Sequence, residues 1–135
     1  MNKFIEDIEK VIDSHLPYRQ VISVPIDKLF FHYLFINGVY ILYLNKKIIY
    51  IGDSMNIGSR LRYHVFPNSS NTKKVTEIDV IRFKDGENTL EVEARLIKKF
   101  NPIYNKSNKY LGSWSLPENF DMDRLILNIK LGMDK

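Results

Sequence analysis

The chain has 135 residues, of which 44% are hydrophobic, and carries a formal net charge of +4. This length suits one globular domain with a buried core, which we expect over residues 1–135. The absence of cysteine excludes a disulfide framework, an iron–sulfur cluster and a cysteine-ligated zinc site. No apolar run approaches the roughly 20 residues that cross a membrane, and the start MNKFIEDIEK does not resemble a signal peptide. We therefore expect a soluble cytoplasmic protein without a membrane partner.

The first half of the chain predicts a helix followed by a β-hairpin. Apolar residues recur at helical spacing over residues 3–14, and Pro17 ends that pattern. Residues 17–37 are mixed, with an aromatic run that predicts a short buried segment of undetermined type. Two β-branched and aromatic runs, over 39–44 and 47–51, flank a polar two-residue turn and predict the hairpin.

In the second half of the chain, three segments have apolar residues at helical spacing and predict helices. One segment has alternating apolar residues and predicts a strand. The predicted elements are a helix over 57–65, a polar loop over 67–74, a strand over 75–83, a helix over 87–100 and a last helix over 121–131. A hairpin, a third strand and flanking helices predict an α+β fold with a small antiparallel three-stranded sheet.

Charge is unevenly distributed along the chain. Residues 1–15 hold four acids and two lysines, whereas residues 95–109 hold five basic residues and no acid. A basic half beside an acidic one fits a polyanionic partner, although a solvated surface gives the same pattern.

Glu93 breaks the pattern of the helix predicted over 87–100. At about 100° per residue it falls inside the apolar arc, between Phe100 and Ile97. A carboxylate in that place is costly unless it is paired, hydrogen-bonded or bound to a metal. The alternatives are a structural salt bridge or an edge position open to solvent.

Arg60 and His64 lie four residues apart, along one border of the apolar stripe formed by Ile57, Leu61 and Val65. A guanidinium and an imidazole on one edge can hold and protonate a phosphate. An ordinary surface pair has the same spacing, so this alternative stays open.

Tyr40 and Tyr50 are two of the three tyrosines on the predicted hairpin. By alternation, Tyr40 shares a face with Leu42 and Leu44, while Tyr50 shares one with Ile48. Tyrosines in strands are more often core residues with one polar tip than catalytic groups.

These separate features form one pattern when they are taken in chain order. The pattern is Gly38-Val39-Tyr40, Tyr50-Ile51-Gly52, Arg60, His64, Glu93 and Asn105. It resembles the GIY-YIG nuclease family, with a core over 37–106, an N-terminal helical extension over 1–36 and a C-terminal extension over 107–135. One departure is Asp53, since many family members carry a lysine directly after the second glycine. Asp53 removes a cation from the edge of the site and is a candidate for holding a hydrated metal ion.

The resemblance implies a metal-dependent DNA endonuclease that hydrolyses phosphodiester bonds, of the homing, restriction or repair type. It implies that Glu93 ligates one Mg²⁺ or Mn²⁺ ion per site, since hard cations take carboxylate oxygens. Arg60 would stabilise phosphate charge, and Tyr40 would contact the attacking water. His64 competes with Tyr40 for the role of general base.

Further roles follow from the same resemblance. Tyr50 would position the arginine or the phosphate, and Asn105 would brace the site by hydrogen bonding. The basic residues expected to contact DNA are Arg62, Lys73, Lys74, Lys98, Lys106 and Lys109.

A competing hypothesis is a catalytically silent nucleic-acid-binding module that retains the GIY-YIG fold. Only about 36 residues precede the motif and about 30 follow it, so we expect low sequence specificity or a homodimer. A double-strand break would need that homodimer or two successive nicks. Ala94 is the sole alanine beside abundant Ile, Asn and Lys, which is typical of AT-rich bacterial, phage or viral genomes.

Overall fold

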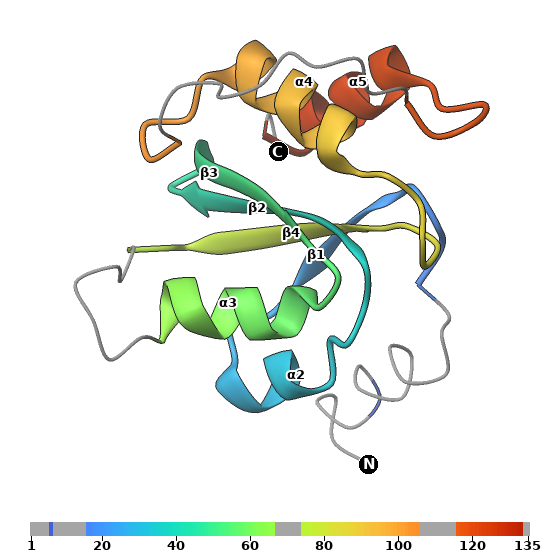
Figure 1. The fold of residues 1–135 in the computed structure, drawn as a ribbon. Coiled ribbons are helices and arrows are strands. Elements are labelled where there is room, and N and C mark those ends of the chain that lie inside the picture. Colours follow the sequence, from blue (N-terminus) through green and yellow to red (C-terminus); the bar gives the residue numbers. More distant parts are fainter. Residues whose placement is uncertain (1–5, 7–15, 67–73, 106–115, 134–135) are drawn as a thin grey trace.

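Residues 6, 16–66, 74–105 and 116–133 are described by the computed structural model of the chain. They form an antiparallel sheet with helices on both faces (Figure 1). The elements in chain order are β1 (Val21–Val24), α2 (Lys28–His32), β2 (Gly38–Leu44), β3 (Lys47–Ser54), α3 (Ile57–Val65), β4 (Glu77–Arg82), α4 (Leu90–Phe100) and α5 (Met122–Met133). The predicted α+β class is confirmed. The helix predicted over 3–14 lies outside the described residues except for Glu6, which is helical.

The sheet has four strands in the order β1-β4-β2-β3, and not the three that the sequence predicted. The missed strand, β1, is only four residues long and ends directly before Pro25. It pairs with β4, where Val21 lies opposite Ile81. Because this pairing joins segments far apart in the chain, no local pattern reveals it.

The hairpin of β2 and β3 turns at Asn45 and Lys46, whose φ angles are 50° and 67°. Positive φ at both central residues is typical of the turn that suits the twist of a two-residue hairpin. The register shifts between Leu42 and Tyr43, so that Tyr50 lies opposite Leu42 and Ile48 lies opposite Tyr43.

This irregularity corrects the expected placement of Tyr50. The extra residue in β3 puts Tyr50 on the face opposite to Ile48, because a bulge interrupts the alternation of side chains. Tyr50 therefore shares the face of Tyr40 and Leu42.

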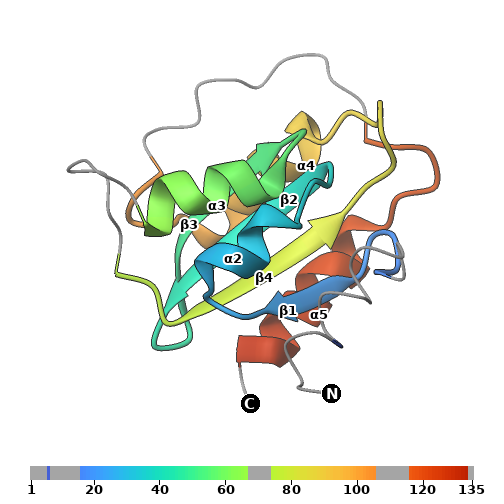
Figure 2. The same cartoon turned by 90° about the horizontal axis from the view of Figure 1, so that it is seen from below.

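Two apolar cores lie on the two faces of the sheet. Figures 1 and 2 show α2 and α3 on one face, and α4 and α5 on the other. Tyr40 and Leu42 of β2 belong to the core under α2 and α3, whereas Val39 and Ile41 belong to the core under α4 and α5. The predicted helices over 57–65, 87–100 and 121–131 correspond to α3, α4 and α5.

Local sequence explains where α3 and α4 lie. The Asn56 side chain accepts a hydrogen bond from the Ser59 amide at 3.2 Å and caps α3. Asn101, with φ at 46°, ends α4 in the left-handed conformation, and Pro102 follows it. Across the described ranges, no helix is long and apolar enough to span a bilayer.

Candidate active site

The residues singled out in the sequence converge on β3, the edge strand that carries α4 on one face and α3 near the other. β2 and β3 contribute Tyr40 and Tyr50, α3 contributes Arg60 and His64, and α4 contributes Glu93. Side chains from four elements thus lie close together at β3.

Tyr40 and His64 form the buried centre of this arrangement. The Tyr40 hydroxyl lies 3.1 Å from Nε2 of His64, and only 1% and 3% of the two residues are exposed. The sequence placed His64 at the border of the apolar stripe of α3, whereas it lies within the buried face. Gly52 lies opposite Tyr40 on β3, and a Cβ atom there would collide with the Tyr40 ring. The glycine therefore makes room for the ring.

Tyr50 adds a third ring to the pair. Its ring centroid lies 4.6 Å from that of His64 and 6.1 Å from that of Tyr40. Burial raises the pKa of Tyr50, and the Arg60 charge counteracts this effect. The three rings form one cluster that holds the imidazole in place.

Arg60 brings a positive charge to the tyrosines. Its guanidinium carbon lies 4.8 Å from the centroid of the Tyr63 ring, within the range of a cation–π contact. The pKa of Tyr40 is raised, because burial and the nearby Tyr50 outweigh the hydrogen bond and charge of Arg60. The Tyr40 hydroxyl therefore remains protonated at neutral pH.

Glu93 lies half-buried next to Asp53. Burial, together with the hydrogen bond and negative charge of the Asp53 carboxylate, raises the pKa of Glu93 to about 8, although the hydrogen bond from the Asp53 backbone N–H acts in the opposite direction. Asp53 also accepts a hydrogen bond from the Thr89 hydroxyl at 2.9 Å. The neighbour of Glu93 is therefore a second carboxylate, and not the basic side chain that a salt bridge would require.

Asn105 satisfies the free edge of β3. Its side-chain oxygen accepts from the Ile51 amide at 2.9 Å, and its amide nitrogen donates to the Ile51 carbonyl at 2.8 Å. The Tyr104 amide donates to the Ile49 carbonyl at 3.0 Å. Because Ile51 lies between Tyr50 and Gly52, these contacts fix the strand that carries the site.

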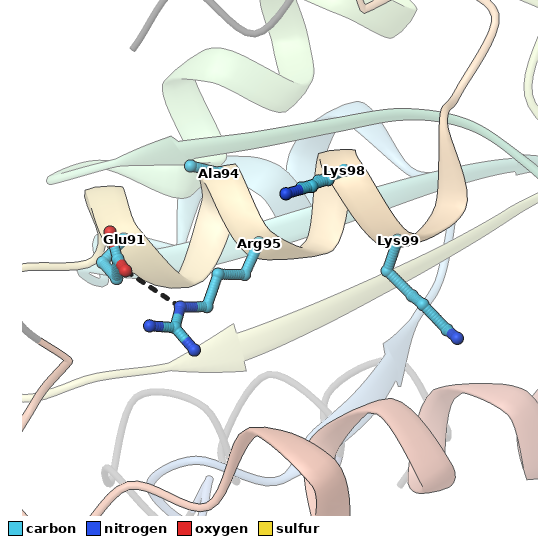
Figure 3. Close-up of a pocket in the computed structure, with 5 residues that line it drawn as sticks. All are labelled: Glu91, Ala94, Arg95, Lys98 and Lys99. Carbon is cyan, nitrogen blue, oxygen red and sulfur yellow. Dashed lines mark hydrogen bonds and ion pairs between the residues drawn. The ribbon is translucent and has the colours of Figure 1, made fainter. Parts of the chain in front are cut away.

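The predicted DNA contacts are not all visible. Arg62, Lys74 and Lys98 are described and exposed, whereas Lys73, Lys106 and Lys109 lie outside the described residues. Lys98 and Lys99 project from α4 beside the ion pair of Glu91 and Arg95 (Figure 3), where they line a surface hollow of about 540 Å³.

The donor atoms of the site fit a hard divalent cation. Glu93 and Asp53 provide carboxylate oxygens, the ligand type that Mg²⁺ and Mn²⁺ prefer. Within the described ranges, no group of three or more His, Asp or Glu side chains is arranged to hold a metal ion. Water and phosphate oxygens would therefore complete the coordination of a cation bound here.

Two residues of the site were not found by sequence reasoning. Tyr63 follows Arg60 by three residues, a spacing that places side chains side by side on a helix. Thr89 directly precedes α4 and gave no signal, because its partner Asp53 is distant in the chain.

A family model described as "UvrC-like GIY-YIG domain" matches residues 36–106. The chain is 35% identical over 75 residues to the UvrABC system protein C of Borrelia duttonii (strain Ly) and to that of Borrelia recurrentis (strain A1). Each match covers 51% of this chain and 12% of the relative, so the chain spans about an eighth of the length of those proteins.

Similar solved structures include the GIY-YIG N-terminal endonuclease domain of UvrC from Thermotoga maritima, bound to its catalytic divalent cation, magnesium. That chain is 24% identical, with a TM-score of 0.46, and the match covers 78% of this chain and all of that one. A point mutant of the same domain matches at 24% identity and a TM-score of 0.47, over 79% of this chain and all of the mutant chain.

Proposed function

The chain belongs to the family of UvrC-like GIY-YIG domains, and from this membership we propose that it is a divalent-metal-dependent DNA endonuclease. The observation that carries the proposal is the convergence of Tyr40, His64, Arg60 and Glu93 on the edge of β3. Phosphodiester hydrolysis needs a proton acceptor for the attacking water, a cation for the phosphate and a ligand for the metal. The four side chains supply these three functions.

Proton transfer in this site runs through Tyr40 and His64. Because its raised pKa keeps the Tyr40 hydroxyl protonated, Tyr40 orients the attacking water and does not act as a free phenolate. His64 lies within hydrogen-bonding distance of that hydroxyl, at 3.1 Å. A neutral imidazole accepts a proton at its unprotonated ring nitrogen, so we assign to His64 the role of receiving the proton that the water loses through Tyr40.

Charge stabilisation falls to Arg60 and to the metal site. The Arg60 guanidinium binds the non-bridging phosphate oxygens, whose negative charge grows in the transition state. Glu93 would hold the cation, which supplies Lewis-acid stabilisation of the phosphate and of the leaving oxygen when bound. Asn105 contributes by fixing the backbone of β3.

Of the homing, restriction and repair types, the repair type is favoured. The matching family model and the Borrelia relatives both belong to UvrC. Exposed Arg62, Lys74 and Lys98 provide cationic side chains for the DNA backbone.

A plasmid assay tests the proposal. Purified protein is incubated with supercoiled DNA in Mg²⁺, in Mn²⁺ and in a chelator, and the nicked and linear products are separated on a gel. We expect nicking that the chelator abolishes. A linear product without a nicked intermediate would support a homodimer. DNA binding without cleavage under every metal condition would favour the catalytically silent module and overturn the proposal.

A further inference from the structure

Asp53 lies in β3 and is anchored to the start of α4. Its Oδ2 atom accepts a hydrogen bond from the Thr89 hydroxyl at 2.9 Å, and Thr89 is only 5% exposed. A buried hydroxyl that donates to a carboxylate restricts its rotamer. The orientation of Asp53 is therefore set before any ligand binds.

The same threonine connects Asp53 to Glu93. The Glu93 amide donates to the Thr89 carbonyl at 2.9 Å, so Glu93 follows Thr89 by one helical turn. The Glu93 side chain also contacts both the side chain and the backbone N–H of Asp53. Thr89 thus brings a carboxylate from β3 and a carboxylate from α4 face to face.

Two half-buried carboxylates in contact repel one another unless a proton or a cation lies between them. The described residues give each acid no basic partner in an ion pair, whereas Glu91, which lies on the other side of α4, pairs with Arg95 at 2.9 Å. A glutamate with a purely structural role would be expected to pair with a basic side chain, as Glu91 does with Arg95. The Asp53–Glu93 pair instead matches the oxygen donors of a divalent-cation site.

We propose that Asp53 is a second carboxylate ligand of the metal site, so that one Mg²⁺ or Mn²⁺ ion is held between Asp53 and Glu93. This inference rests on the proposed function, which assigns the cation to Glu93. It makes the site bind its cation in the absence of DNA, because two carboxylates replace more of the hydration shell than one. Thr89 is a positioning residue that orients Asp53 through its hydroxyl.

The test is isothermal titration calorimetry of Mn²⁺ and Mg²⁺ into the full chain without DNA. Asp53→Asn keeps the shape of the side chain and an acceptor for Thr89, but removes the charge. We expect it to weaken Mn²⁺ affinity by tenfold or more, within the range typical for losses around a metal site. Thr89→Val, which keeps both acids, should weaken affinity by a smaller factor.

Glu91→Gln is the matched control. It removes one negative charge from α4 without touching Asp53 or Glu93, and we expect less than a threefold change in affinity. Thermal melting of each variant in chelator establishes that it is folded. Equal Mn²⁺ affinity of the wild type and a folded Asp53→Asn variant would overturn the inference.

The two proposals fail in different ways. If the wild type cuts DNA with a metal but Asp53→Asn binds Mn²⁺ unchanged, the second ligand is wrong and the nuclease stands. If the wild type binds Mn²⁺ through Asp53 but cuts no DNA, the nuclease is wrong and the metal site stands.

Discussion

The Tyr40 hydroxyl lies 3.1 Å from Nε2 of His64, and both side chains are buried. β2 carries a second buried tyrosine, Tyr43, whose hydroxyl donates to Asp79 at 2.7 Å and does not face the proposed site. The two tyrosines therefore share a strand and similar burial but differ in their hydrogen-bond partner. This difference provides a controlled test of the proton path.

Tyr40→Phe removes only the hydroxyl that connects the attacking water to His64. We expect the cleavage rate constant to fall by about 100-fold or more, which is typical for the loss of a proton-transfer group. Tyr43→Phe should leave the rate within about threefold of the wild type, although it removes a buried hydrogen bond. Single-turnover cleavage of a labelled duplex measures both variants. Equal rates for the two would remove Tyr40 from the proton path.

The stability of the metal-free protein should depend on pH through Glu93. The pKa of Glu93 is about 8 in the folded protein and near its ordinary value of 4.5 in the unfolded chain, so the folded state binds the proton more tightly. Its contribution to stability is therefore fully present below about pH 4.5 and is lost as the pH rises through about 8. The glutamine of Glu93→Gln cannot ionise, so this variant should not lose that stability as the pH rises.

Melting temperatures in chelator, measured from pH 5 to pH 9, check this dependence. The melting temperature of Glu93→Gln relative to the wild type should rise with pH. Added Mn²⁺ should stabilise the wild type at pH 8 and leave Glu93→Gln unchanged. A difference between the two proteins that is constant across the range would contradict the raised pKa.

The contact between Arg60 and Tyr63 should hold the guanidinium for phosphate binding. Tyr63→Leu removes the ring, and we expect turnover to fall between about twofold and thirtyfold, the factor that corresponds to a cation–π contact. Tyr63→Phe keeps the ring and should restore the rate. The Kd for DNA should change less than turnover. A Tyr63→Phe variant as slow as Tyr63→Leu would show that the ring is not what matters.

Asn105 should stabilise the fold through its hydrogen bonds to the edge strand β3. Asn105→Ala leaves the Ile51 amide and carbonyl without their partner, and we expect the free energy of unfolding to fall by about 1–3 kcal/mol. Asn128→Ala, an exposed position on α5, should change it by less than about 0.5 kcal/mol. Urea denaturation measures both. Equal stability of the two variants would indicate that water replaces the Asn105 amide.

The parts of the fold that depend on local pattern were predictable. Two β-branched and aromatic runs around a polar turn indicated the hairpin, and helical spacing of apolar residues indicated α3 at the observed bounds. Strand β1 was missed, because its four residues become a strand only through pairing with β4. The bulge that turns Tyr50 to the face of Tyr40 leaves no mark in the order of apolar residues.

The candidate site was predictable where it depends on local sequence spacing. Glu93 was singled out as a candidate because it is a charged residue within the apolar arc of α4. Arg60 and His64 were singled out because they lie four residues apart on α3. Their partners were not predictable, because the contacts of Glu93 with Asp53 and of His64 with Tyr40 join separate elements. The salt-bridge alternative for Glu93 could be excluded only once the positions of β3 and α4 were known, because its neighbour Asp53 is a second carboxylate.

The proposed nuclease depends on Glu93 as the ligand of the metal ion that DNA cleavage requires. The decisive experiment measures the single-turnover cleavage rate of a duplex in Mg²⁺ with Glu93→Gln and Glu91→Gln, which make the same carboxyl-to-amide replacement on opposite faces of α4. We expect no cleavage by Glu93→Gln above the chelator background, whereas Glu91→Gln should cut within about threefold of the wild-type rate. Cleavage by Glu93→Gln at the wild-type rate would contradict this role of Glu93.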